Sequence, residues 1–195
     1  MNMQEKVRAL TVEEQKRLYE VLTTEDIHYS DQMLISMLTG MRMGEINALQ
    51  VKDVNFTFNT ITVNKTVTRG EKGRAILGES AKTEAGSRTL PMREKVREIL
   101  KNCVQDKQSG QIFMRKKKLI TTNQVNAQFA RVLEKYDIID ETVDGRVDLH
   151  SSFDMITWGD LDIHRISEPQ VRMTEFFEQT ARFIPPDSSL LMREM

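Results

Sequence analysis

Residues 38–46 read Leu38-Thr39-Gly40-Met41-Arg42-Met43-Gly44-Glu45-Ile46, and Leu49 and Val51-Lys52-Asp53-Val54 follow them. The apolar residues before Thr39 repeat at helical spacing, Gly40 ends that helix, and a second helix opens at Met43. The Arg42 guanidinium then lies beside a helix N-terminus, where unpaired N–H groups and the helix dipole favour an anion such as phosphate. The alternative is that Arg42 only pairs with Glu45. The stretch predicts two helices joined by a glycine turn, with an anion-binding arginine at the junction.

A second informative stretch reads Ala81-Lys82-Thr83-Glu84-Ala85-Gly86-Ser87-Arg88-Thr89-Leu90-Pro91-Met92. Residues 87–92 predict a strand that stops at Pro91, which places Lys82 on the turn before it. A lysine on a turn is ordinarily just solvated. Arg88 falls on the strand, where we expect a structural or phosphate-contacting role.

The rest of the hydrophobic pattern predicts further helices and a few strands. Thr11 followed by Glu14 is a capping-box pattern, and Asp31 is the expected cap of the next helix. The predicted helices cover residues 11–23, 31–38, 43–49, 93–102 and 122–136. Period-two alternation predicts strands near residue 55, over 61–67 and over 87–90, with a loop at 69–73. These strands are expected to form a small antiparallel sheet.

Composition bounds the class of protein. A chain of 195 residues with net charge −1 is long enough for one ordinary domain with its own core. Cys103 is its one cysteine and its three histidines are scattered, so we expect no disulfide and no metal site. No apolar run approaches the length of a membrane span. The sequence predicts a cytoplasmic protein without membrane or small-molecule partners.

The two quoted stretches together, at their spacing, resemble the catalytic domain of tyrosine recombinases, the phage integrase family. The resemblance implies a mainly α (α+β) fold, a helical domain with a small antiparallel sheet. It implies double-stranded DNA as the partner, homo-oligomers on DNA, and DNA integration by site-specific recombination. The implied mechanism uses no metal and no nucleotide or other cofactor. In such a domain a tyrosine attacks the scissile phosphate and forms a covalent link to the 3′ end. The family's pattern makes Arg42 a phosphate clamp and Lys82 the general acid.

Basic residues elsewhere are further candidates for DNA contact. The run Arg115-Lys116-Lys117-Lys118 could lie along a phosphate backbone, and with Arg88 we take Lys116 and Lys117 as candidate DNA-binding residues. The alternative explanation of this run is a solvated surface loop.

The chain departs from the family's pattern after residue 151. His150 matches the start of the family's His-x-x-Arg box and is expected to support proton transfer, but Phe153 stands where the second arginine belongs. The tyrosines are Tyr19, Tyr29 and Tyr136, all before this point. Lysine is absent after Lys135, which marks a shift in composition near the same place.

A shifted reading frame would explain these departures together. The codons of residues 152–157, read from the third base of the Ser152 codon, can encode Leu-Arg-His and restore His-Ser-Leu-Arg-His. We therefore predict a partial catalytic domain at 1–151 and a tail at 152–195 that does not match the family. A genuine divergent tail is the alternative. On this interpretation the chain is an inactive, truncated recombinase, or else a catalytically dead DNA-binding remnant.

Overall fold

Five helices and several short strands make up the part of the chain that the structure describes. The computed structural model describes residues 7–70, 73–79, 87–143 and 146–147. The helices are α1 (Val12–Thr24), α2 (Ser30–Thr39), α3 (Met43–Asn47), α4 (Glu94–Val104) and α5 (Thr122–Lys135), with a 3-10 turn at Val51–Asp53. The strands are β1 (Val7–Arg8), β2 (Val54–Asn55), β3 (Thr60–Val63), β4 (Lys65–Arg69), β5 (Ala75–Glu79), β6 (Arg88–Pro91), β7 (Met114–Arg115), β8 (Lys118–Leu119) and β9 (Arg146–Val147). The predicted α+β class with antiparallel strands is confirmed.

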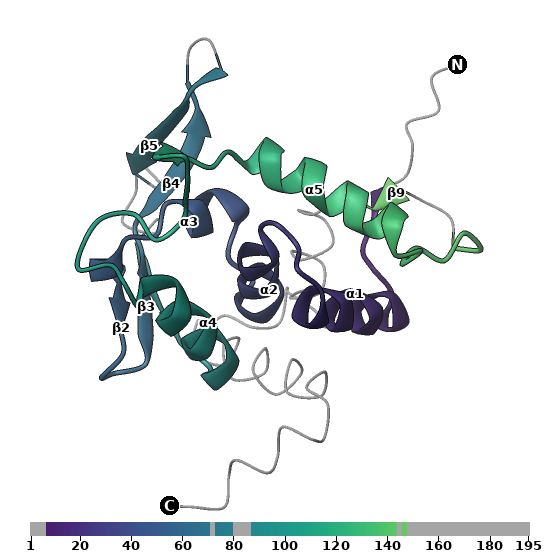
Figure 1. Cartoon of the computed structure of the whole chain (residues 1–195), viewed down its shortest axis with the longest axis horizontal. Coiled ribbons are helices and arrows are strands. Elements are labelled where there is room, and N and C mark those ends of the chain that lie inside the picture. Colours follow the sequence, from purple (N-terminus) through teal and green to yellow (C-terminus); the bar gives the residue numbers. More distant parts are fainter. Residues whose placement is uncertain (1–6, 71–72, 80–86, 144–145, 148–195) are drawn as a thin grey trace, which may run out of the picture.

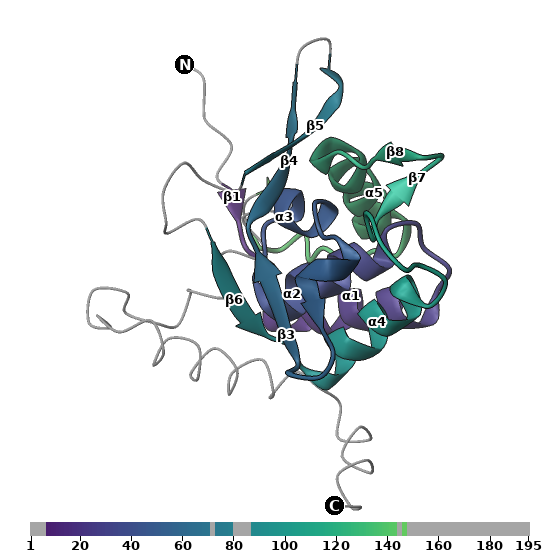
Figure 2. The same ribbon diagram turned by 90° about the vertical axis from the view of Figure 1, so that its left-hand side faces the viewer.

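The strands form a three-stranded sheet and a separate hairpin, whereas the sequence predicts a single small sheet. An antiparallel sheet has the order β2-β3-β6, with Ile61 opposite Leu90 and Val63 opposite Arg88. The strand predicted over 61–67 is divided at Asn64, because the residues after it pair with β5 and not with β6. The resulting β4–β5 hairpin extends beyond the three-stranded sheet (Figure 2). β5 has no counterpart in our prediction.

Local signals decide where the helices begin and end. In the capping box of α1, the Glu14 backbone N–H donates to Thr11 Oγ1 at 3.3 Å, and the Thr11 N–H donates to the Glu14 carboxylate at 2.7 Å. The prediction that Asp31 caps α2 is wrong, since α2 begins at Ser30 and Asp31 lies inside its first turn. A negative charge there still interacts favourably with the helix dipole. α2 ends at Gly40, whose φ of 66° favours glycine.

The hydrophobic core lies where the helices meet one another and one side of the sheet (Figure 1). α2 is buried on most of its surface and contacts α1, α3, α4 and α5. Side chains that are completely buried include Leu18, Met33, Ile35, Ile46, Ile61, Val96, Leu100 and Phe129. At about 25 cal/mol for each Å² of apolar surface removed from water, these residues supply the main stabilisation of the fold.

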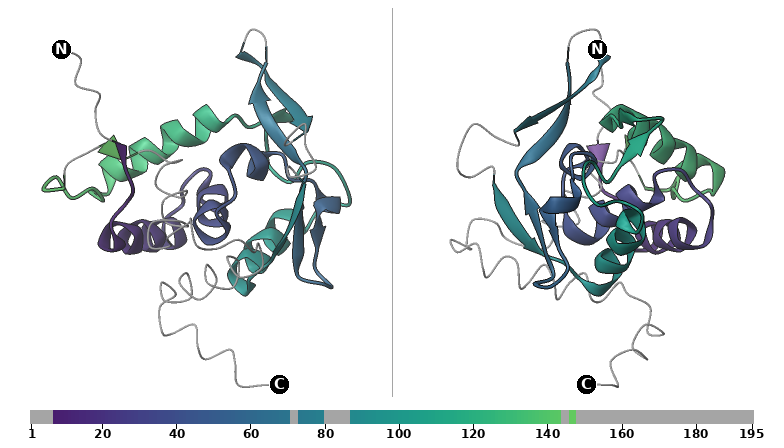
Figure 3. Two further views of the ribbon diagram at one scale, coloured as in Figure 1. Left: turned by 180° about the vertical axis from the view of Figure 1, so that it is seen from behind. Right: turned by 60° about the vertical axis from the view of Figure 1, so that its left-hand side comes forward.

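The short helix α3 connects the helical part of the molecule to the strands. It contacts α2 and α5 on one side and β4 on the other, an arrangement visible from behind in Figure 3. Gly44 makes the approach to β4 possible, because a Cβ at this position would lie 2.5 Å from Thr66 Oγ1 and 3.0 Å from the Val67 carbonyl oxygen. The position of Arg42, directly before α3, is therefore set by packing against β4.

The described residues form neither a membrane-spanning helix nor a metal-binding cluster. None of the helices between residues 7 and 147 that the structure describes is long and apolar enough to cross a membrane. Nor do the described histidine, cysteine and carboxylate side chains form a group of three that could hold a metal ion.

Candidate active site

Arg42 lies between α2 and α3 with an extended backbone, as the residue that precedes the first turn of α3. Its backbone N–H donates to a carboxylate oxygen of Glu45 at 3.0 Å, which fixes the start of the helix. Its side chain is exposed. The guanidinium therefore projects from a rigid junction into solvent, where it can meet an anion.

Glu45 is held by Arg88 from the neighbouring sheet. The two terminal nitrogens of Arg88 donate to the two carboxylate oxygens of Glu45 at 2.9 and 2.7 Å. Burial by itself would raise the pKa of the Glu45 carboxyl, but the hydrogen bonds and charge of Arg88, with the Arg42 N–H and charge, lower the pKa below its usual value. Glu45 is therefore ionised, and the positive charge of Arg88 on β6 balances its charge. This pairing argues against the alternative that Arg42 only pairs with Glu45.

The ion pair with Glu45 gives Arg88 a structural role. Both of its terminal nitrogens are engaged with Glu45, and the side chain is 38% exposed. It connects β6 to α3 and so supports the position of Arg42. Its candidate contact with DNA stays a prediction.

Two other candidate residues lie outside the part of the chain that the structure describes. Lys82 falls in the stretch 80–86, between β5 and β6 in the sequence. His150 falls in the stretch that follows β9. Their roles, and the whole predicted tail at 152–195, remain expectations from the sequence.

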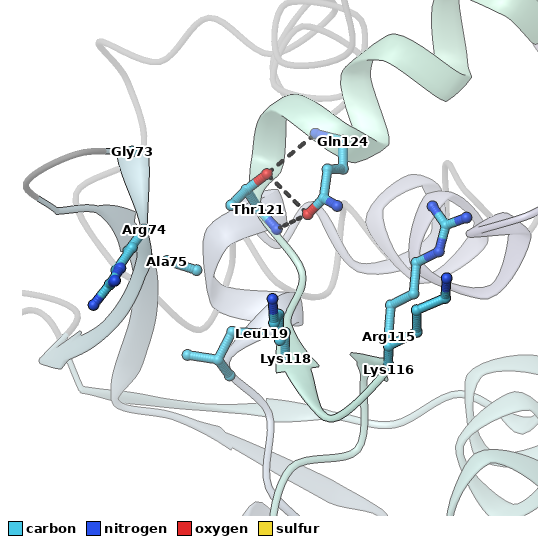
Figure 4. Close-up of a pocket in the computed structure, with 9 residues that line it drawn as sticks. All are labelled: Gly73, Arg74, Ala75, Arg115, Lys116, Lys118, Leu119, Thr121 and Gln124. Atoms are coloured by element: carbon cyan, nitrogen blue, oxygen red, sulfur yellow. Dashed lines mark hydrogen bonds between the residues drawn. The ribbon is translucent and has the colours of Figure 1, made fainter.

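The basic run at 115–118 forms a short hairpin at the surface, and both explanations offered for it, contact with DNA and a solvated loop, stay predictions. Arg115 pairs with Lys118 across β7 and β8, and Lys116 and Lys117 form the two-residue turn with exposed side chains. The hairpin borders a cleft of about 860 Å³, shown in Figure 4. The cleft is lined by Gly73, Arg74, Ala75, Arg115, Lys116, Lys118, Leu119, Thr121 and Gln124.

Arg74 is a residue of this cleft that sequence reasoning missed. It precedes β5, and the pairing of β5 with β4 brings it near the hairpin of β7 and β8, which β5 contacts. The glycines around it, Gly70 and Gly73, indicated a loop, but the sequence contains no signal for what that loop would face.

The three tyrosines occupy structural positions. The Tyr29 hydroxyl accepts a hydrogen bond from Arg115 at 2.9 Å. The Tyr136 hydroxyl accepts from the Lys135 ammonium at 2.9 Å and donates to the Glu25 carboxylate at 3.2 Å. Tyr19 is half-buried on α1 and packs against the core.

Comparison with known proteins gives a family and a curated relative. Residues 8–151 match the sequence model of the phage integrase family. The integrase of Staphylococcus phage L54a is 34% identical over 89 residues, which cover 42% of this chain and 25% of that protein. The chain thus spans about a quarter of the length of this curated relative.

Solved structures share the fold at low sequence identity. The Tn1549 transposon integrase, in complex with a circular intermediate DNA, has a TM-score of 0.70 at 18% identity, with 91% of this chain and 62% of that chain covered. The XerA recombinase has a TM-score of 0.56 at 17% identity, covering 97% and 63%. A lambda integrase dimer bound to a core site has a TM-score of 0.52 at 16% identity, covering 91% and 58%. The fold, the order of its motifs and the match over most of the chain agree, and the chain belongs to the phage integrase family.

Proposed function

We propose that this chain derives from a site-specific DNA recombinase of an integrating mobile element and acts on double-stranded DNA in the cytoplasm. The observation that carries the proposal is the exposed Arg42, held before α3 while Arg88 neutralises the adjacent carboxylate of Glu45. A guanidinium in such a position can donate two parallel hydrogen bonds to phosphate oxygens. The solved relatives in complex with DNA support the same partner.

The proposed chemistry is phosphoryl transfer without metal or cofactor. Arg42 stabilises charge on the non-bridging oxygens of the scissile phosphate, and Lys82 protonates the leaving 5′ oxygen. His150 supports the proton transfer. In an intact relative, a tyrosine would be the nucleophile, and homo-oligomers would assemble on the DNA.

We further propose that this polypeptide does not itself join DNA strands. The hydroxyls of Tyr29 and Tyr136 are engaged in hydrogen bonds, Tyr19 packs against the core, and Phe153 replaces the second arginine. Without a nucleophile the covalent step cannot occur. Residues 1–151 are then a partial catalytic domain and 152–195 a tail read in a shifted frame. The alternative is a catalytically dead remnant whose remaining function is to bind DNA.

The test uses a nicked duplex that carries the end of the mobile element and traps any covalent protein–DNA product. We expect duplex binding but no covalent product from this chain. A second chain, translated in the shifted frame after Ser151, is the matched control and should form the product if the frame hypothesis is right. A covalent product from the unaltered chain would overturn the proposed inactivity.

Binding itself tests the larger proposal. Arg42→Lys keeps the charge but loses the bidentate geometry, and Arg42→Ala loses both. We expect affinity for duplex DNA to fall in that order. Absence of any duplex binding by the wild-type chain at low salt would overturn the proposal that DNA is its partner.

A further inference from the structure

A pocket separate from the candidate active site lies where the start of α2 and the end of α4 meet the hairpin of β7 and β8. Residues within the ranges 28–32, 103–107 and 112–120 line it, and its volume is about 310 Å³. Pockets that bind small molecules in proteins begin at about this size. The described residues of its lining include none of the candidates for catalysis or DNA contact, which are Arg42, Arg88, Lys116 and Lys117.

The Gln32 side chain at this pocket has an unsatisfied hydrogen-bond donor. Gln32 is one of the residues that line the pocket and is 3% exposed, and its Nε2 has no acceptor in the part of the chain that the structure describes. A buried amide without a partner destabilises a protein, so native folds seldom keep one. An acceptor atom of a bound molecule would supply the missing hydrogen bond.

The backbone at the start of α2 also favours an acceptor. Tyr29 precedes the helix with a φ of 67°, and no side chain caps the first turn. Left-handed backbone at a residue other than glycine is strained and occurs often at binding sites. The N–H groups of an uncapped first turn, together with the helix dipole, attract a negative charge. The Asp31 carboxylate of this turn is not part of the lining and accepts from Cys103 Sγ at 3.4 Å.

Two cations of the lining are held in place by other groups of the protein. Lys107 Nζ donates to the carbonyl oxygens of Cys103 and Ile112, both at 2.8 Å, and an ammonium has a third N–H to offer. Arg115 donates to the Tyr29 hydroxyl at 2.9 Å, and its guanidinium carbon lies 5.9 Å from the centre of that ring. Because these contacts limit the rotamers of both side chains, less entropy is lost when an anion binds.

No negative charge in the described lining opposes an anion. The described residues that line the pocket include no aspartate or glutamate. Burial raises the pKa of the Cys103 thiol to about 12, so this side chain is uncharged near neutral pH. The polar side of the pocket is therefore cationic.

Apolar side chains line the pocket beside these donors. Ile112, Phe113 and Ile120 belong to the hydrophobic core, whereas Met114 is 45% exposed. Methionine is flexible and adapts its shape to different apolar partners. A molecule that fills this pocket therefore needs an apolar body as well as an anionic end.

We propose that this pocket binds a small carboxylic acid whose carboxylate is attached to an apolar group. The carboxylate accepts hydrogen bonds from Gln32 Nε2, Lys107 and Arg115, and the apolar group packs against Phe113 and Met114. An inorganic phosphate would satisfy the cations but would leave the apolar side chains in contact with water. None of these groups has a part in the proposed chemistry, so the site goes beyond the proposed function.

The test uses phenylacetate as the probe and follows its binding to the full chain by heteronuclear NMR. We expect a saturable shift of the Gln32 side-chain amide signal. Phenylacetamide keeps the apolar group but lacks the charge, and its affinity should be about tenfold lower. Acetate and inorganic phosphate lack the apolar group and should bind more weakly by about tenfold or more.

Gln32→Met separates binding from stability, because it keeps the length of the side chain and removes the unpaired amide. The melting temperature should rise by about 3 °C, since no polar group is then buried there without a partner. The affinity for phenylacetate should fall by about tenfold, because one hydrogen bond to the carboxylate is lost. A purely structural role of Gln32 would not produce these opposite effects.

The matched control is Asn47→Leu on α3. Asn47 is completely buried, and both polar atoms of its side-chain amide lack a partner among the described residues, but it does not line the pocket. This variant removes another unpaired amide and should leave the affinity for phenylacetate unchanged. An equal loss of affinity in both variants would overturn the inference, because it would show a general effect on the fold.

Other outcomes would also overturn the site. These are wild-type affinity for phenylacetate in Gln32→Met, an unshifted Gln32 amide signal at saturating probe, and binding of inorganic phosphate as tight as that of phenylacetate. Each of them leaves the proposed function standing, since none concerns DNA. Absence of duplex binding by the wild-type chain would count against the proposed function alone.

Discussion

At the scale of single residues, the geometry around Arg42 depends on Glu45. This carboxylate is 2% exposed and accepts from the Arg42 backbone and from both terminal nitrogens of Arg88. An ionised carboxylate can be buried only when such partners replace its water. The buried Glu45 carboxylate is therefore paired with Arg88, and the Arg42 side chain stays at the surface.

Arg88→Ala tests this pair. The buried carboxylate would lose its charged partner, so we expect the free energy of unfolding in urea to fall by about 2 kcal/mol, less than for a fully buried pair because Arg88 is partly exposed. Lys95→Ala breaks an exposed pair with Glu98 and should cost no more than about 0.5 kcal/mol. Adding Glu45→Gln to Arg88→Ala should restore part of the loss. An additive double variant would contradict the coupling.

Gly44 gives a second test at this scale. Alanine is the better helix former by about 1 kcal/mol, yet its Cβ would lie 2.5 Å from Thr66 Oγ1. Overpacking of this kind costs about 1–3 kcal/mol, so we expect Gly44→Ala to lower the melting temperature. The matched control is Gly78→Ala on β5, where the nearest atom to a new Cβ is 4.0 Å away. A stabilised Gly44→Ala chain would show that α3 does not pack against β4 as described.

At the scale of elements, the bounds of the helices follow from the local sequence, whereas the pairing of the strands does not. The helices over Val12–Thr24, Glu94–Val104 and Thr122–Lys135 lie within two residues of their predicted bounds, because capping and apolar periodicity are local. The partner of β4 was not predicted. β5 reads Ala-Ile-Leu-Gly-Glu, without clear alternation, and its pairing depends on residues before the loop at 70–74.

The N-terminus of α5 offers a test of a local signal. The Gln124 N–H donates to Thr121 Oγ1 at 3.3 Å, and the Thr121 N–H donates to Gln124 Oε1 at 2.9 Å. Thr121→Ala removes the acceptor and should cost about 1 kcal/mol of unfolding free energy. Thr121→Ser keeps the hydroxyl and should cost much less. Equal losses in the two variants would mean that the methyl group, and not the cap, provides the stabilisation.

At the scale of the whole molecule, the buried carboxylate of Glu14 joins segments that are far apart in the sequence. Arg8 on β1 donates to both carboxylate oxygens of Glu14 at 2.7 Å, and the Asp140 N–H donates to the same carboxylate at 2.8 Å. β1 also pairs in parallel with β9. The start of the described chain is thereby fixed to the region that follows α5.

This cluster predicts a loss of stability in acid. Burial by itself would raise the pKa of Glu14, but the hydrogen bonds from Arg8, Thr11 and Asp140 lower it from 4.5 to about 2. The folded state therefore binds the proton less tightly than the unfolded state does. The stabilisation is complete above the unfolded pKa of 4.5 and is lost as the pH falls through about 2. The loss should reach about 3 kcal/mol once the pH is below both values.

The measurement is urea unfolding of the wild type and Glu14→Gln over this range of pH. The variant should be less stable near neutral pH, and the difference between the two chains should disappear in acid. A difference that stays constant with pH would contradict an ionised Glu14 in the folded state.

The sequence by itself determined the family, the helices and the identity of the candidate residues Arg42, Lys82 and His150. It could do so because capping, helical periodicity and motif spacing act over short stretches of chain. Only the tertiary structure decided that Glu45 pairs with Arg88, and that Arg74 shares a cleft with the basic hairpin. Both depend on strand pairing, which joins residues through hydrogen bonds between segments distant in the sequence. The nine residues around Arg42 predicted it as a candidate for anion binding, whereas the partner that neutralises the adjacent Glu45 comes from a strand more than forty residues away.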